Sequence, residues 1–281
     1  MSEELRCNFR IKGLTAPVEE LAHGNIKLRG LASSDEAILS LLVPISGAMS
    51  NEKAADDSKR EVENIIQVYG LITNHPLEIL SSTCEKILNG AVKELTFTIK
   101  VIPTYNEEVR KKKRPIIEKT LKKYVEIQEV FSSKSKFFLR NAIDYFARSL
   151  KDVLLEEKLL DLMIALESLF SNEQDELSYR YSLRASSLLS IGQTKYSRLE
   201  IYGSIRDLYN KRSLVVHGVK KVELDNFDVL FLQENVREAI KRLLYIEMPK
   251  GKIIELLDAS ILDENYEKVL IEKVLEAIAK W

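Results

Sequence analysis

Residues 207–218 read Asp207-Leu208-Tyr209-Asn210-Lys211-Arg212-Ser213-Leu214-Val215-Val216-His217-Gly218. Arg212 is a permanent cation, and His217, five residues later, carries an imidazole that can accept or release a proton near neutral pH. Together these groups can act on a phosphodiester without a metal ion. In a chain with three histidines, an arginine four to six residues before a histidine occurs by chance roughly four times in ten. The rest of the sequence must therefore decide whether the pair is functional.

The composition is that of a globular protein whose charges are balanced overall. The chain has 281 residues, of which 45% are hydrophobic and 30% charged, and its net charge is −1. This length allows two units with packed cores, and any attraction for phosphate has to come from local clusters of Lys and Arg. Two cysteines are too few for a disulfide framework, which favours the reducing cytoplasm. We expect no signal peptide and no membrane segment, because the longest apolar run, 37–49, is short and interrupted.

Residues 1–115 predict a small α+β unit of unknown role that ends in a basic linker. Alternation of apolar and polar residues predicts strands at 6–13, 25–31 and 95–101. Helices are expected from the Ser-Ser-Asp-Glu sequence at 33–36, at about 50–72, and at about 77–88, where Asn89-Gly90 is interpreted as a helix stop.

Five consecutive cations close this unit just before Pro115, and they are Arg110, Lys111, Lys112, Lys113 and Arg114. One interpretation is a solvated linker. The other is a set of phosphate contacts, since each neutralised phosphate releases counterions. We keep the run as a candidate for binding RNA.

Residues 116–250 predict a helical domain, and 251–281 predict a helical tail. In 137–155, for example, apolar residues recur at spacings of three and four and form one stripe: Leu139, Ile143, Phe146, Leu150 and Val153. Similar stripes predict helices over 159–170, from about 177 to 191, over 197–216 and over 223–248. Short connections favour an antiparallel bundle, so the fold class is mainly α. The tail carries one more stripe, which we interpret as a packing or oligomerisation surface: Val269, Leu270, Val274, Leu275 and Ile278.

Three segments then occur in a fixed order: LMIALESLF at 162–170, ELSYRYSLRAS at 176–186 and LYNKRSLVVHG at 208–218. Together they resemble the Apea-like branch of the HEPN superfamily, over about 137–248. The resemblance implies an all-helical domain of the kind found in ribonuclease toxins and anti-phage effectors. It also implies a homodimer in which an Arg, the polar residue after it and a His of each protomer share one cleft. These are Arg212, Ser213 and His217 here.

Helix geometry agrees with a shared site. Residues five apart point about 140° away from one another on a straight α-helix. Either the helix ends near His217, which Gly218 favours, or a second chain completes the site. The expected roles are general acid and base for His217, phosphate clamp for Arg212, and hydrogen-bonding positioner for Ser213. The structural alternative is that His217 caps the helix and that Arg212 pairs with Asp207 or Glu200 on the surface.

Five further residues support this hypothesis. Glu167 lies in an apolar helix, where it either holds Arg212 or another arginine or lies at a solvated edge. Tyr209 is interpreted as core or dimer seam, next to the RNA-binding candidate Lys211. Arg180 and Arg184 are one helical turn apart and contact either RNA or neighbouring side chains.

The sequence thus predicts an endoribonuclease that cleaves single-stranded RNA without metal or cofactor and leaves 2′,3′-cyclic phosphate ends. We expect a cytoplasmic homodimer used in antiviral defence or as a toxin. A regulatory protein or a small-molecule trigger stays open as a further partner. The alternative is a non-catalytic HEPN-type module for binding or dimerisation, because fold alone does not fix activity.

Overall fold

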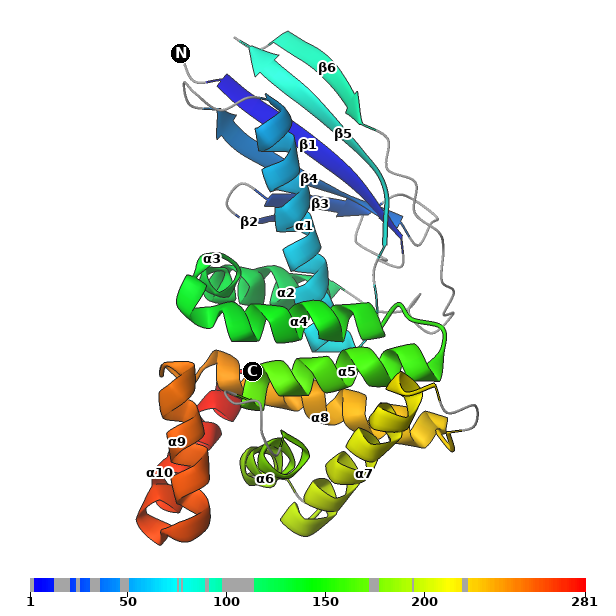
Figure 1. The fold of residues 1–281 in the computed structure, drawn as a ribbon. Coiled ribbons are helices and arrows are strands. Elements are labelled where there is room, and N and C mark those ends of the chain that lie inside the picture. Colours follow the sequence, from blue (N-terminus) through cyan, green and yellow to red (C-terminus); the bar gives the residue numbers. More distant parts are fainter. Residues whose placement is uncertain are drawn as a thin grey trace. The chain divides into compact units, whose positions relative to one another are not determined.

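The computed structural model describes residues 3–12, 21–23, 26–30, 36–45, 51–74, 76, 78–88, 91–97, 114–171, 177–193, 195–218 and 222–281. The chain divides into two compact units, Met1–Glu126 and Ile127–Trp281 (Figure 1). Each unit has its own core, and each is described by itself.

The first unit contains a six-stranded antiparallel sheet in the order β2-β3-β4-β1-β5-β6. The strands are β1 (Glu3–Lys12), β2 (Leu21–His23), β3 (Ile26–Gly30), β4 (Glu36–Ile45), β5 (Glu78–Leu88) and β6 (Ala91–Phe97). On β1, the alternate residues Cys7, Phe9 and Ile11 are buried, as expected for one covered face of a strand. Helix α1 (Asn51–Thr73) contacts β1, β4 and β5 (Figure 1).

Two expected helices of this unit are strands. Residues 36–45, expected to follow a helix start, form β4, and residues 78–88 form β5. A short apolar run such as 37–43 has no periodicity that separates a buried strand from a helix, and pairing with β1 and β3 decides for the strand. Asn89-Gly90, interpreted as a helix stop, lies between the paired residues Leu88 and Ala91. The same dipeptide is the commonest two-residue hairpin connection.

Cys7 is buried and disulfide-bonded. The register of β1 and β5 sets Cys7 opposite Cys84, the other cysteine of the chain. The count of two cysteines did not lead us to expect this bond. Strand pairing brings together residues that are far apart in the sequence.

Helix α2 (Arg114–Ile127) belongs almost wholly to the first unit, whereas the sequence placed the boundary at 115. Tyr124 explains the difference, because it is buried and forms hydrogen bonds with Asn64 and Glu61 of α1. The pKa of Tyr124 is raised by burial and by the Glu61 carboxylate.

The second unit is a helical bundle, as the periodicity predicts. Its elements are α3 (Glu129–Ser132), the 3-10 turn η2 (Lys134–Lys136), α4 (Phe137–Ser149), α5 (Leu155–Phe170), α6 (Leu177–Leu189), α7 (Arg198–Val216), α8 (Asn226–Leu244), α9 (Lys250–Leu262) and α10 (Glu264–Ala279). Helix α5 contacts α4, α6, α7 and α8, and it is therefore the centre of the bundle. In Figure 1, α4 and α5 lie across the view while α6 is seen nearly end-on, so the helices cross.

The tail forms two helices that pack on the bundle. Helix α9 contacts α6, and α10 contacts α8. Leu270 and Val274 of the predicted stripe are buried, whereas Val269 and Leu275 stay partly exposed. The Trp281 indole N–H donates to the carbonyl of Lys241 at 2.8 Å, which fixes the C-terminal end against α8.

Candidate functional site

Helix α7 carries the Arg212 to His217 stretch and has well-defined ends. Its N-cap is Ser197, which forms a capping box with Glu200: the Ser197 hydroxyl accepts from the Glu200 N–H at 3.2 Å, and the Glu200 carboxylate accepts from the Ser197 N–H at 2.7 Å. Its C-cap is His217, followed by Gly218 at φ 71°. Gly218 adopts the left-handed conformation at little cost, so the helix ends where the sequence predicted.

Glu167 of α5 lies beside Arg212 of α7. The distance from Arg212 Nη2 to Glu167 Oε1 is 3.8 Å, and the two side chains are 25% and 24% exposed. Burial raises the pKa of Glu167, and the Arg212 charge opposes this shift. Of the two interpretations of Glu167, the structure shows the one in which it lies against Arg212. Arg212 pairs with neither Asp207 nor Glu200, the partners that the structural alternative named.

Two tyrosines complete this cluster. The Arg212 guanidinium lies 5.9 Å from the centre of the Tyr209 ring, and the Tyr209 ring meets Tyr181 of α6 edge-on at 5.4 Å. The Tyr181 hydroxyl and Arg212 Nε are buried without a hydrogen-bond partner among the described residues. The pKa of Tyr181 is raised by burial and by Glu167. The cluster thus contains one unused donor on the guanidinium and one unused hydroxyl, which are costly to bury unless something else pairs with them.

His217 lies at the end of α7, away from this cluster. Its side chain is exposed, and its backbone N–H donates to the Ser213 carbonyl at 3.0 Å. Five residues of helix separate Arg212 from His217, which corresponds to about 7.5 Å along the axis and about 140° around it. No contact within the described part of the chain joins the side chains of Arg212, Ser213 and His217. One copy of the chain therefore presents Arg212 and His217 in different directions.

The structure assigns Arg184 to packing and not to RNA contact. Its guanidinium is buried and holds Asp258 of α9 through two hydrogen bonds of 2.7 Å, and it donates to the Phe170 carbonyl at 2.8 Å. These contacts use the donors that a phosphate would need. Sequence spacing could not show this, because Asp258 is 74 residues away along the chain.

The remaining RNA-binding candidates differ in their surroundings. Lys211 is paired with Asp228 at 2.8 Å and with Asp207 at 3.3 Å, so its charge is already matched by two carboxylates. Arg180 is half-buried on α6, next to the exposed Tyr179. Residues 110–113 of the basic run lie outside the described residues, and Arg114 is described only as the first residue of α2.

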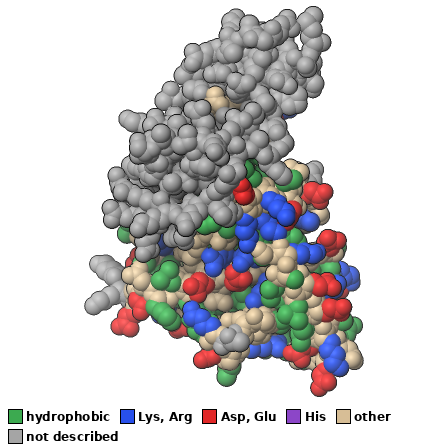
Figure 2. All heavy atoms as spheres, turned by 180° about the vertical axis from the view of Figure 1, so that it is seen from behind, with side chains coloured by type: hydrophobic (Ala, Val, Ile, Leu, Met, Phe, Trp, Pro, Cys, Tyr) green, Lys and Arg blue, Asp and Glu red, His purple; other side chains and the backbone are tan. Residues whose placement is uncertain are grey.

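Charge is mixed over the described part of the surface in Figure 2, where Lys and Arg are interspersed with Asp and Glu. Within the described residues, no helix is long and apolar enough to cross a membrane. Nor do three His, Cys, Asp or Glu side chains gather there in a way that could hold a metal ion.

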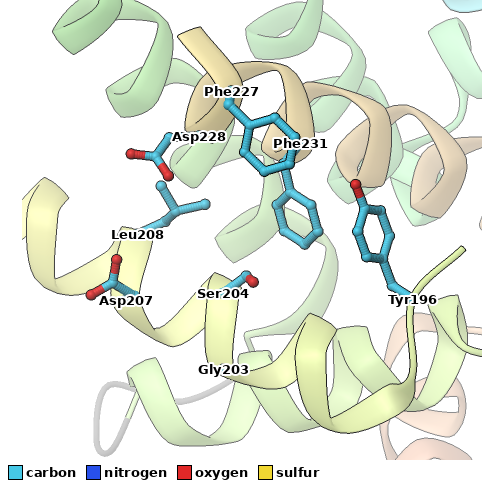
Figure 3. A pocket seen from close by; sticks show the side chains of 8 residues that line it. All are labelled: Tyr196, Gly203, Ser204, Asp207, Leu208, Phe227, Asp228 and Phe231. Carbon is cyan, nitrogen blue, oxygen red and sulfur yellow. The ribbon is translucent and has the colours of Figure 1, made fainter. Parts of the chain in front are cut away.

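Sequence reasoning missed a pocket of about 290 Å³ between α7 and α8 (Figure 3). Its lining residues are Tyr196, Gly203, Ser204, Asp207, Leu208, Phe227, Asp228 and Phe231. The only signal available in advance was Asp207 four residues before Lys211 on one helix face. Nothing in the sequence shows that Asp228 and Phe227 lie across from them.

Comparison of the chain with protein-family models, with curated proteins and with solved structures gives no match.

Proposed function

We propose that the protein is an endoribonuclease whose site is completed by a second copy of the chain. The observation that carries the proposal is the state of Arg212. Its guanidinium is held beside Glu167 and Tyr209, and a quarter of the side chain stays exposed, where a substrate can reach it. A planar cation with donors to spare is well suited to clamp a phosphate.

The proposed reaction is an internal transfer at phosphorus. The 2′-oxygen of the RNA attacks phosphorus while one His217 imidazole accepts its proton, and a second, protonated imidazole gives a proton to the departing 5′-oxygen. Arg212 stabilises the negative charge that builds up on the phosphoryl oxygens. The products are a 2′,3′-cyclic phosphate and a 5′-hydroxyl. This scheme needs two imidazoles and no metal ion.

A homodimer supplies both imidazoles. Next to His217, the apolar side chains of Leu214 and Val216 are 44% and 54% exposed. Apolar residues on the solvent side of a helix end are covered at low cost by a second copy about a two-fold axis. The resemblance to Apea-like HEPN domains supports the same arrangement, and it extends the proposal to a defence or toxin-type effector. The disulfide bond of Cys7 does not support the cytoplasmic location that the cysteine count had favoured.

The test is cleavage of a labelled single-stranded RNA in excess EDTA. We expect cutting that continues in the chelator and is lost in both His217→Ala and Arg212→Ala. Arg206→Ala is the matched control, because Arg206 is an exposed arginine on the same helix. Absence of cutting at every pH by a folded protein would favour the alternative, a non-catalytic module for binding or dimerisation. A monomer by light scattering at micromolar concentration would contradict the shared site.

A further inference from the structure

The pocket between α7 and α8 has aromatic walls. The Tyr196 and Phe231 rings meet edge-on at 5.2 Å, and Phe227 stands at the rim with 66% of its surface exposed (Figure 3). Leu208 closes the apolar side. Flat walls of this kind bind a flat ring by stacking, as aromatic side chains do with unpaired bases.

The polar groups that line the pocket are the Asp207 and Asp228 carboxylates, which only accept hydrogen bonds, and the Ser204 and Tyr196 hydroxyls, which can also donate. Lys211 Nζ lies 3.3 Å from Asp207 Oδ2 and 2.8 Å from Asp228 Oδ2. The Oδ1 atoms of both carboxylates accept no hydrogen bond from any residue that the structure describes. With two carboxylates and one lysine, the local charge is negative. A phosphate is therefore disfavoured in the pocket, and a ligand that brings donors is favoured.

The size of the pocket suits one base. A volume of about 290 Å³ lies just below the usual range for small-molecule sites, about 300–1,000 Å³. Among the four RNA bases, guanine alone presents two adjacent donors, N1–H and the N2 amino group, on its pairing edge. Adenine and cytosine place an acceptor beside their amino group, which would face a carboxylate oxygen.

We propose that this pocket binds a guanine base, with its ring stacked on the Phe227 side and its N1–H and N2–H donating to Asp207 and Asp228. If the base belongs to an RNA substrate, the inference rests on the proposed ribonuclease and gives it a preference for guanosine. If the base belongs to a free guanine nucleotide, the same contacts hold and the nucleotide is a regulatory ligand.

Two exposed helical glycines provide a matched pair of variants. A Cβ on Gly203, which lines the pocket, would meet nothing within 4 Å, and the same is true of Gly251 on α9. Gly203→Leu therefore adds a bulky side chain at the pocket lining without a clash at its Cβ, and Gly251→Leu adds the same side chain elsewhere. Asp207→Asn is the second test, because Asp207 is largely exposed and its replacement removes a charged acceptor.

Binding is measured by saturation-transfer NMR with 5′-GMP and 5′-AMP on the full chain. We expect 5′-GMP to bind roughly tenfold more tightly than 5′-AMP, a preference in the range of one well-placed bidentate contact. Gly203→Leu and Asp207→Asn should each lose it, while Gly251→Leu keeps it. Equal signals for the two nucleotides, or an unchanged signal in a folded Gly203→Leu, would overturn the proposal.

The source of the base is decided by cleavage mapping on RNAs with one or no guanosine. If the wild type cuts next to guanosine and Gly203→Leu loses this preference, the base belongs to the RNA substrate. Binding of 5′-GMP by a protein that cuts no RNA supports the pocket and refutes the ribonuclease. RNA cutting without base preference, by a protein that does not bind 5′-GMP, supports the ribonuclease and refutes the guanine pocket.

Discussion

The ion pair between Glu167 and Arg212 allows a quantitative test of the candidate site. At 3.8 Å and an effective dielectric constant of about 20, two unit charges attract by about 4 kcal/mol. Burial of Glu167 cancels part of this attraction, as the raised pKa of this carboxyl shows. We therefore expect a net coupling of about 1–2 kcal/mol between the two side chains.

The assay is a double-mutant cycle by urea unfolding with Glu167→Leu, Arg212→Met and the double variant. Each single variant leaves an unpaired charge in a largely buried place. The double variant should therefore lose less stability than the sum of the losses in the two single variants. The control cycle uses Lys252 and Glu255, which are closer at 2.6 Å but 64% and 65% exposed. Exposed pairs of this kind contribute little to stability, because water and salt screen them.

The comparison of the two cycles can refute the reasoning. If burial determines the strength of the interaction, the longer Glu167–Arg212 pair couples more strongly than the shorter surface pair. Coupling at or below the surface value would mean that Glu167 does not hold Arg212. It would also remove the main support for Arg212 as a fixed phosphate clamp.

Two further predictions concern buried charges. Burial raises the pKa of Asp161 from 3.8 to about 6, with Arg148 opposing the shift, so the folded chain keeps a proton that the unfolded chain releases. Unfolding free energy should then fall as pH rises from about 4 to 6, by at most about 3 kcal/mol. In Asp161→Asn, the unfolding free energy measured with urea should change less between these pH values. A pH dependence equal to that of the wild type would show that Asp161 is not its cause. Arg184→Ala should destabilise the fold by about 1–3 kcal/mol, because the Phe170 carbonyl and the half-exposed Asp258 carboxylate lose their partner. Little loss of stability together with weaker RNA binding would restore Arg184 as an RNA contact.

Local patterns predicted the second unit well because its helices follow local rules. The buried part of the α4 stripe, the N-cap Ser197 and the stop at Gly218 all depend on residues within a few positions of one another. The expected stripe over 137–155 extended too far, because α4 ends at Ser149 and Val153 is 78% exposed. The sheet was harder. The strand β4 is an apolar run whose identity depends on its pairing partners, and the Asn-Gly after β5 suits a hairpin as well as a helix end.

Long-range pairs also limited what the sequence could predict about the candidate site. Glu167 could be expected to need a cation, because a carboxylate among apolar neighbours is costly. No local signal indicated that Asp258 would take Arg184 or that Asp228 would take Lys211. In both cases the partner is on another helix, so only the packing of the bundle decides which cations are already matched.

The structural and catalytic interpretations compete for Arg212 but not for His217. Arg212 has a structural task, since it matches the buried charge of Glu167. The end of α7 is capped by backbone groups: the His217 N–H donates to the Ser213 carbonyl, and the Gly218 N–H donates to the Val215 carbonyl, each at 3.0 Å. The exposed imidazole takes no part in either bond. The structural interpretation thus accounts for the Arg212 side chain, but at the C-cap of α7 it uses only the backbone of His217 and not its imidazole. For that reason loss of activity in His217→Ala, with stability unchanged, discriminates between the two interpretations better than any substitution of Arg212.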